Sequence, residues 1–137
     1  MGDLAKHFDV LIKKHYYIHE RYGVDVTFAL LYHAEPLAID VIGGLLRLSD
    51  HLHQVDENHY FIVFDFTNQA NAHKACQNLL CRLDDHFRDT ESCIALDAFD
   101  TTKSTPIVLR RLQQILSEVR KRPRVRIDNE TILDGRM

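Results

Sequence analysis

The sequence predicts an α+β domain of the ferredoxin-like or palm type, with a split βαβ (βαββαβ) core in an antiparallel sheet and a flanking helix at each end. Stretches with apolar residues at helical spacing alternate with short stretches rich in branched and aromatic residues. Two of the short stretches, residues 51–55 and 60–66, are separated by only four polar residues, which indicates a hairpin. The length of 137 residues fits a single domain over residues 1–137.

The first part of the chain predicts a helix, a strand and a second helix. Apolar residues recur at helical intervals over residues 3–22. Residues 24–33 are nearly all apolar, which is typical of a central strand covered on both faces. A buried stripe then predicts a helix over residues 36–50. Gly43 and Gly44 lie inside this helix at a cost of about 1 kcal/mol each, so we expect them to allow a close approach to a neighbouring element.

The second part of the chain follows the hairpin with a helix, a strand and another helix. Thr67 or Asn68 is a suitable cap for the first of these helices. A strand is predicted over residues 92–99, and a helix is predicted to begin at Thr105. The last segment, residues 124–135, alternates around a polar turn and indicates a terminal hairpin or an edge strand.

The strand over residues 60–66 carries large apolar groups on both faces. One face takes Tyr60, Ile62, Phe64 and Phe66, and the other takes Phe61, Val63 and Asp65. Because the helices of a split βαβ core cover only one side of the sheet, the N-terminal helix or another chain must cover the second side. We therefore expect a docking surface there and dimerisation. Asp65 and Asp97 each interrupt an apolar strand, which places them on this open face or at an edge.

The charge and the distribution of apolar residues exclude several classes of protein. A net charge of -3 gives no field that would draw the domain onto nucleic acid. Basic residues gather only in residues 120–126, which indicates a solvated helix end or, alternatively, an anion or partner site. No apolar run reaches the roughly 20 residues needed to cross a membrane, and the first residues lack signal-peptide features. We expect a cytoplasmic protein with no direct membrane insertion.

Neither the cysteines nor the histidines show the spacing of a metal site. Cys76, Cys81 and Cys93 lack the CxxC pattern and are interpreted as reduced, mostly buried thiols. The chain has nine histidines, of which His15 and His19 stand four apart, but without the HExxH order. We expect no metal and no cofactor.

The middle of the chain carries a specific pattern. Arg47-Leu48-Ser49-Asp50 is followed by five residues, then by Asp56-Glu57-Asn58-His59-Tyr60 and by the apolar strand "FIVF". This succession resembles the GGDEF family of diguanylate cyclases, a family of bacterial signalling domains. Its members commonly show Arg-x-x-Asp, five residues, the GGDEF or GGEEF turn and an apolar strand. Later stretches, "NQANAHKACQNLLCRL", "SCIALDAF" and "LQQILSEVRK", are similar to the elements that follow in the family.

The signature itself departs from that of the active enzymes. In those enzymes the two glycines let the backbone approach GTP, and the acids bind magnesium. Here Asp56 and Glu57 take the places of the glycines, Asn58 and His59 stand where the acids would be, and only the aromatic Tyr60 is kept. The resemblance therefore implies a degenerate signature turn without cyclase activity.

The segment before the hairpin departs as well. The family's metal-binding aspartate after the first strand is missing, and His33 and Glu35 stand there instead. A single helix over residues 36–50 replaces the two helices and substrate-holding loop of the active enzymes. Both departures strengthen the expectation that the chain is not an enzyme.

Three functional hypotheses follow. The first is an inactive GGDEF-like regulatory domain that acts through protein–protein contacts or a homodimer, with the helix over residues 3–22 as the connection to another module. The second is a cyclic di-GMP effector, because the resemblance implies that Arg47 and Asp50 form the family's inhibitory site. Alternatively, the two residues form only a surface ion pair at a helix end. The third is a palm-type nucleotidyl enzyme, which would need carboxylates clustered at the ends of the central strands. The candidate acids are instead dispersed in the sequence: Asp56, Glu57, Asp65, Asp97 and Asp100.

Overall fold

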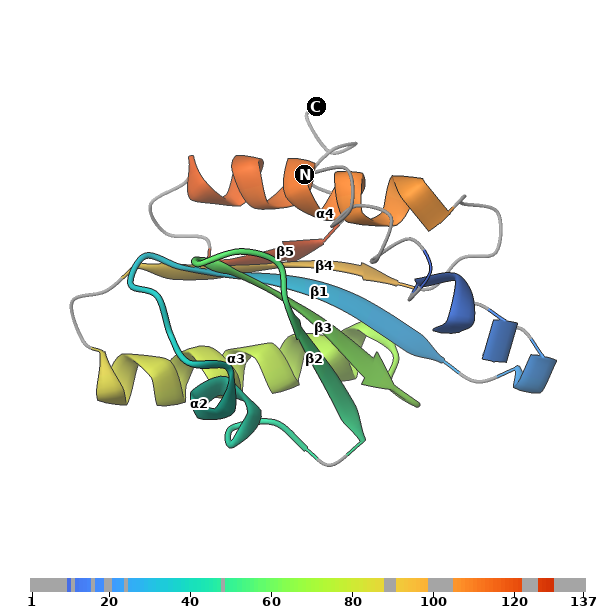
Figure 1. The fold of residues 1–137 in the computed structure, drawn as a ribbon, viewed down its shortest axis with the longest axis horizontal. Coiled ribbons are helices and arrows are strands. Elements are labelled where there is room, and N and C mark those ends of the chain that lie inside the picture. Colours follow the sequence, from blue (N-terminus) through green and yellow to red (C-terminus); the bar gives the residue numbers. More distant parts are fainter. Residues whose placement is uncertain are drawn as a thin grey trace.

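Five strands form one mixed sheet in the order β2-β3-β1-β4-β5 (Figure 1). The computed structural model describes residues 10, 12–15, 17–18, 21–23, 25–47, 49–87, 91–98, 105–121 and 126–129. The strands are β1 (Val26–His33), β2 (Asp50–Gln54), β3 (His59–Asp65), β4 (Ser92–Ala98) and β5 (Ile127–Asn129). The helices are α2 (Ile39–Gly43), α3 (Gln69–His86) and α4 (Thr105–Arg120).

The split βαβ core is confirmed. The strands β2, β3, β1 and β4 pair antiparallel with their neighbours. The core is antiparallel as predicted, and β5 adds to it an edge strand that pairs parallel with β4. A parallel neighbour requires a crossover connection, and α4 provides it. For the last segment, the edge-strand alternative is confirmed over residues 127–129, and the remainder of that segment lies outside the described residues.

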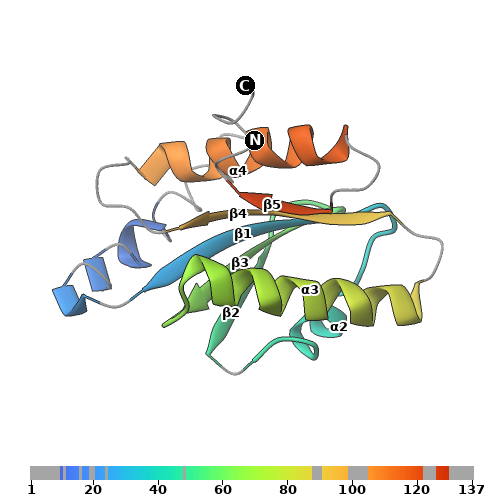
Figure 2. The ribbon, with the colours of Figure 1, turned by 180° about the vertical axis from the view of Figure 1, so that it is seen from behind.

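The helices cover both faces of the sheet. Figures 1 and 2 show α2 and α3 on one side and α4 on the other. The expectation of an open second face is therefore wrong, since α4 covers it together with Ile12 from the N-terminal segment. The prediction gave this cover to the N-terminal helix or to another chain. Ile12 agrees with the first of these, but the apolar stripe of α4 was not expected on this face. An uncovered face was the reason for expecting dimerisation, so this reason no longer holds.

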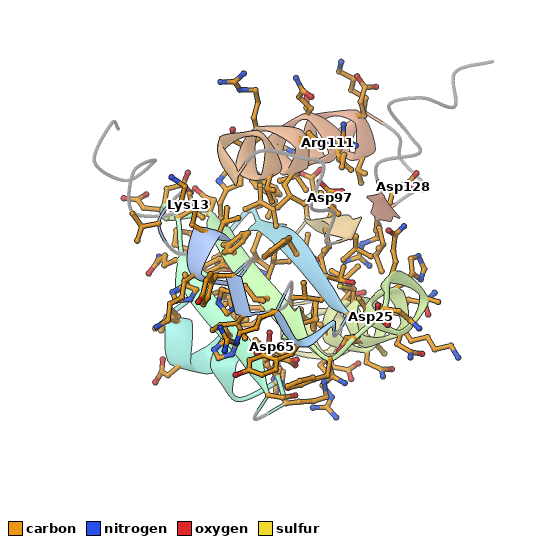
Figure 3. The ribbon with its side chains drawn as sticks, turned by 90° about the vertical axis from the view of Figure 1, so that its right-hand side faces the viewer. Lys13, Asp25, Asp65, Asp97, Arg111 and Asp128 are labelled. Atoms are coloured by element: carbon orange, nitrogen blue, oxygen red, sulfur yellow. The ribbon has the colours of Figure 1, made fainter. Side chains whose placement is uncertain are left out.

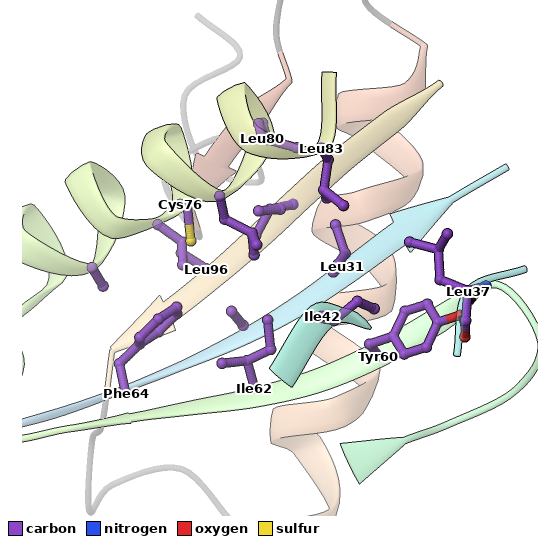
Figure 4. Packing of buried hydrophobic residues seen from close by; sticks show 14 residues of the cluster. Leu31, Leu37, Ile42, Tyr60, Ile62, Phe64, Cys76, Leu80, Leu83 and Leu96 are labelled. Atoms are coloured by element: carbon purple, nitrogen blue, oxygen red, sulfur yellow. Dashed lines mark hydrogen bonds between the residues drawn. The ribbon is translucent and has the colours of Figure 1, made fainter. Parts of the chain in front are cut away.

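Each side of the sheet has its own core. On the α4 side, the ring of Phe28 from β1 stacks on that of Phe61 from β3, with centroids 5.8 Å apart. The α2 and α3 side holds the larger set shown in Figure 4, which includes Tyr60, Ile62 and Phe64. The alternation predicted for residues 60–64 is confirmed, because odd and even positions of β3 belong to different cores.

Phe66 does not continue that alternation. The strand ends at Asp65, and Phe66 has φ 56° and a side chain that is 72% exposed. A positive φ is unusual for a bulky residue and turns the chain sharply. Two hydrogen bonds hold the turn beside the start of β1: the Thr67 N–H donates to the Asp25 carbonyl, and the Thr27 hydroxyl donates to the Thr67 carbonyl. The placement of Phe66 in the sheet was therefore wrong.

The helix predicted over residues 36–50 is much shorter. Only α2 (Ile39–Gly43) is helical, and the Gly44 N–H closes it by donating to the Asp40 carbonyl. The reason given for the glycines is also wrong, because a Cβ at Gly43 would meet Leu52 only at an ordinary 3.9 Å. Their low helix propensity instead ends the helix early, so the segment crosses to β2 as a loop.

The long helix α3 forms as predicted. The Asn68 side chain caps it by accepting from the Asn71 N–H at 2.9 Å. Its buried stripe includes Cys76, and burial raises the pKa of this thiol to about 12. Cys93 in β4 is also buried, which raises its pKa to about 11, whereas Cys81 is exposed. All three are free thiols.

The N-terminal segment is described only in part. Residues 12–15, 17–18 and 21–22 are helical, in agreement with the prediction for residues 3–22. Ile12 is fully buried, whereas Tyr17 and Tyr22 are more than 60% exposed. The remaining residues of the predicted helix lie outside the described ones. In the described part of the chain, no helix has the length and apolar character needed to cross a membrane.

Candidate functional site

The tip of the β2–β3 hairpin is closed by hydrogen bonds among its own residues. The Asp56 carboxylate accepts from the Asn58 N–H and lies 2.8 Å from the His59 Nδ1, and the Val55 N–H donates to the His59 carbonyl. Partial burial acts to raise the pKa of Asp56, but the hydrogen bonds from His59 and Asn58 outweigh it and lower that pKa below its ordinary value. The Asp56 side chain is thus already engaged within the turn.

Asn58 fastens the tip to the end of β1. Its side-chain amide donates to the carbonyls of His33 and Ala34, each at 3.0 Å. In return, the His33 N–H donates to the Asn58 carbonyl at 2.9 Å. Because both the side-chain amide and the backbone carbonyl of Asn58 are bonded at the end of β1, the turn is held closed over the strand end.

Tyr60 connects the tip to the core of the domain. Its ring is fully buried, and its hydroxyl accepts from the Leu37 N–H at 2.8 Å. The same hydroxyl donates to the Leu37 carbonyl at 2.7 Å, with the Glu57 carbonyl at 3.2 Å as its other acceptor. Tyr60 therefore joins the signature turn to the segment that leads into α2 (Figure 4).

His33 occupies the strand end where the resemblance implies a metal-binding aspartate. It is fully buried, its Nδ1 lies 2.7 Å from the Glu35 carbonyl, and its Nε2 has no hydrogen-bond partner. Magnesium prefers oxygen ligands in octahedral geometry. His33 offers nitrogen, Asp56 is engaged in the turn, and the described residues contain no group of three His, Cys, Asp or Glu that could hold a metal ion. His33 and Asp56 therefore do not offer the open oxygen ligands that magnesium prefers.

Arg47 and Asp50 form a closed pair. The Asp50 carboxylate accepts from the Arg47 backbone N–H at 2.9 Å, from Nε at 3.2 Å and from Nη2 at 2.9 Å. The Asp50 side chain is only 2% exposed, whereas that of Arg47 is 53% exposed. A bidentate pair of this kind is directional and strong for its class. The pairing is confirmed, but its position is not at a helix end, since α2 ends before it.

The same arginine also contacts the turn after β3. Its Nη2 donates to the Thr67 hydroxyl at 3.0 Å, and its guanidinium lies 6.0 Å from the centroid of the Phe64 ring. Thr67 in turn donates to the Asp65 carbonyl. Arg47 thus connects the loop before β2 to the turn before α3, at the end of the sheet opposite the hairpin tip.

The carboxylates of the strands do not form one site. Asp97 is 1% exposed, and its carboxylate lies 3.4 Å from the Nε of Arg111 in α4. Asp65 is paired with His51 from β2 at 2.7 Å. Figure 3 shows the two aspartates apart, each with its own surroundings. Their predicted position on an open face or edge is wrong, because α4 and the N-terminal segment cover that face.

Two features near the end of α4 escaped the sequence reasoning. An open pocket of about 300 Å³ lies between α4 and the hairpin tip. Its lining residues are Leu30, His59, Glu91, Gln113, Leu116, Ser117, Arg120 and Lys121. The guanidinium of Arg120 lies 4.0 Å from the centroid of the Tyr32 ring, a cation–π contact. The basic stretch over residues 120–126 was the only signal that could have indicated this pocket.

The second feature is the clamp formed by Arg126. Its two Nη atoms donate to the Asp84 carboxylate at 2.7 and 2.9 Å, and Nη2 also donates to the Ser92 hydroxyl. The hydrogen bonds from Arg126 lower the pKa of Asp84 below its ordinary value, against the effect of partial burial. This arginine therefore ties the start of β5 to α3. Among the described residues of the basic stretch (120, 121 and 126), Arg120 and Lys121 line the pocket.

Comparison with models of known families finds no match, and neither does comparison with curated proteins. Solved structures do match. The GGDEF domain of DgcB from Caulobacter crescentus, solved in complex with c-di-GMP, has 12% identity and a TM-score of 0.76, with 92% of this chain and 90% of that chain covered. The chain has the fold of a GGDEF domain. The active GGEEF domain of a diguanylate cyclase from Vibrio cholerae agrees, with 10% identity, a TM-score of 0.74 and coverage of 91% and 95%.

A third GGDEF-type structure was solved together with a protein partner. Diguanylate cyclase SiaD from Pseudomonas aeruginosa, in complex with its activator SiaC, has 9% identity and a TM-score of 0.70. The match covers 90% of this chain and 57% of that chain. The resemblance drawn from the pattern around Arg47 and Tyr60 is therefore confirmed at the level of the fold.

Proposed function

We propose that this chain is a catalytically inactive GGDEF-like domain that regulates by contacting a protein, either a partner or a second copy of itself. The observation that carries the proposal is the closed hairpin tip. Asp56 and Asn58 use their side chains to bond the turn to itself and to β1, so the turn offers no open backbone to a triphosphate. His33 and the engaged Asp56 also lack the donor set that magnesium needs.

A protein partner is supported by two observations. Diguanylate cyclase SiaD, a longer chain that contains this fold, takes the protein SiaC as a partner. The pocket beside the tip offers a place for one, since it combines the apolar Leu30 and Leu116 with the cations of Arg120 and Lys121. Arginine next to an aromatic ring is frequent among the residues that dominate binding energy. We also propose that the chain forms a single domain and that it acts in the cytoplasm of a bacterial cell.

Incubation with GTP and magnesium tests the first half of the proposal. We expect no cyclic di-GMP above the level of a protein-free blank, measured by mass spectrometry. The active domain from Vibrio cholerae serves as the positive control. If the chain forms the product, and Asp56→Ala abolishes that formation, the domain is a working cyclase and the proposal is wrong.

Charge reversal in the pocket tests the second half. Light scattering after gel filtration, with the chain alone and with extract of its own cell, should reveal a dimer or a stable complex. Arg120→Glu should weaken that complex at least about tenfold, because it places an acid where the guanidinium meets Tyr32. Arg110→Glu makes the same change on an exposed position of α4 outside the pocket and should leave the complex intact. A strict monomer without partners would contradict the proposal.

A second candidate function is cyclic di-GMP binding through Arg47 and Asp50. The half-exposed guanidinium of Arg47 favours it, because it can turn toward a ligand. Against it stands the Asp50 carboxylate, which is buried and already accepts three hydrogen bonds from Arg47. A ligand must therefore replace a strong pair before it gains its own contacts.

Calorimetry with the dinucleotide decides this candidate. If the site works, Arg47→Ala should lower the affinity at least about tenfold, which corresponds to about 1.4 kcal/mol. Arg110→Ala, on the exposed side of α4, should bind like the wild type. Absence of heat at high micromolar dinucleotide removes the candidate and leaves Arg47 and Asp50 with a structural role.

A further inference from the structure

The pocket between α4 and the hairpin tip contains an arginine that an aromatic ring holds in place. The guanidinium of Arg120 lies 4.0 Å from the centroid of the Tyr32 ring, and this ring contacts the imidazole of His59, with centroids 5.3 Å apart. Among the residues that the structure describes, no carboxylate pairs with Arg120. A guanidinium stacks on an aromatic ring through its flat face, so its N–H groups, which lie in its plane, stay available to an acceptor.

The charges that line the pocket leave a cation in excess. Arg120 and Lys121 contribute two positive charges, and Glu91 contributes one negative charge. The Nζ of Lys121 lies 3.5 Å from the Oε1 of Glu118, but this pair is exposed and such pairs are weak. The pocket is therefore positive on a domain whose net charge is -3, and it is complementary to a carboxylate.

The shape of the pocket fits an extended chain better than a compact small molecule. Gln113, Ser117 and Lys121 line it at intervals of about one turn of α4, which corresponds to a length of about 12 Å. An extended peptide covers this length with about three to four residues. The buried Leu30 and Leu116 add apolar surface to the lining. Small molecules are usually enclosed on most sides, whereas this pocket of about 300 Å³ is open.

We propose that the pocket binds an acidic segment of the protein partner, in which a carboxylate side chain stands next to an apolar one. The carboxylate accepts hydrogen bonds from Arg120, and the apolar side chain packs against Leu116. The exposed side chains of Gln113 and Ser117 bond to the backbone of the segment. This inference rests on the proposed function, because it names the part of the partner that the domain recognises.

A peptide titration followed by heteronuclear NMR tests the inference. The probe is a hexapeptide of alternating leucine and glutamate with blocked ends, and its control has glutamine in place of glutamate. We expect the glutamate peptide to shift the amide signals of residues 113–121 and to bind at least about tenfold more tightly than the control. Arg120→Gln should remove this preference. Arg110→Gln, at an exposed position of α4 outside the pocket, should keep it.

Amides of β1 and β3 report whether each variant is folded, because these strands form the centre of the sheet. The inference stands if the preference for glutamate is seen in the wild type and lost in Arg120→Gln alone. It is overturned if the two peptides act alike or if neither shifts these amides. It is also overturned if pyrophosphate shifts them and the glutamate peptide does not, because the pocket then takes a small anion.

Light scattering separates this inference from the proposed function. If a dimer or a complex forms while the glutamate peptide leaves the pocket unchanged, the inference is wrong and the proposed function stands. A strict monomer without partners contradicts the proposed function, and the inference with it.

Discussion

Replacing Phe61 with alanine should lower the free energy of unfolding by about 3–5 kcal/mol, the usual range for a large buried ring. Phe61 is fully buried in β3, and its ring stacks on that of Phe28. The strand is paired on both sides, with β1 and β2, so the backbone cannot move in to fill the space. On the other side, α4 covers the ring with its own buried stripe. The cavity should therefore remain largely open.

Urea denaturation at pH 7 measures this effect. Phe66→Ala is the matched control, because it removes the same ring five residues later from a side chain that is 72% exposed. This control should change the free energy of unfolding by no more than about 0.5 kcal/mol. Equal losses for the two variants would mean that the face of β3 toward α4 is not a packed core.

The fold was largely predictable because its signals are local. Alternation along residues 60–64 showed that both faces of β3 are buried, and the four polar residues before it showed the hairpin. Which helix covers which face is decided by contacts between distant segments. Leu112 and Ile115 of α4 lie against β1 and β3. The spacing of their stripe fixes that they are buried, but not against which side of the sheet.

The candidate site was predictable only in its position. The pattern after Arg47 located the hairpin tip. The change of glycines to Asp56 and Glu57 predicts that the tip does not bind a nucleotide, which the incubation with GTP tests. The partners of the tip could not be predicted, because Asn58 bonds to the chain 24 and 25 residues away. The pair of His15 with Asp65 joins residues from two elements without any shared motif. Such contacts depend on register and layer order, which a single sequence does not determine.

Tyr60→Phe should lower the free energy of unfolding by about 1–3 kcal/mol, although it removes a single atom. Phenylalanine is the aromatic residue of the family signature, so the change moves the turn toward the family pattern. In this chain, however, the hydroxyl is bonded to both the N–H and the carbonyl of Leu37, a residue only 7% exposed. Without the hydroxyl these two backbone groups are left unsatisfied in a buried place, which is more costly than loss of the bonds alone.

Tyr32→Phe is the control for this substitution. It removes the same atom from a half-buried ring of β1, whose contacts with His59 and Arg120 are made by the ring. We expect it to change the stability by no more than about 0.5 kcal/mol. Amide exchange should also be faster in α2 of Tyr60→Phe, since the hydroxyl ties the start of that segment to the tip. If both variants unfold at the same urea concentration, Tyr60 acts only as a buried ring, and the tip is closed by Asp56 and Asn58 alone.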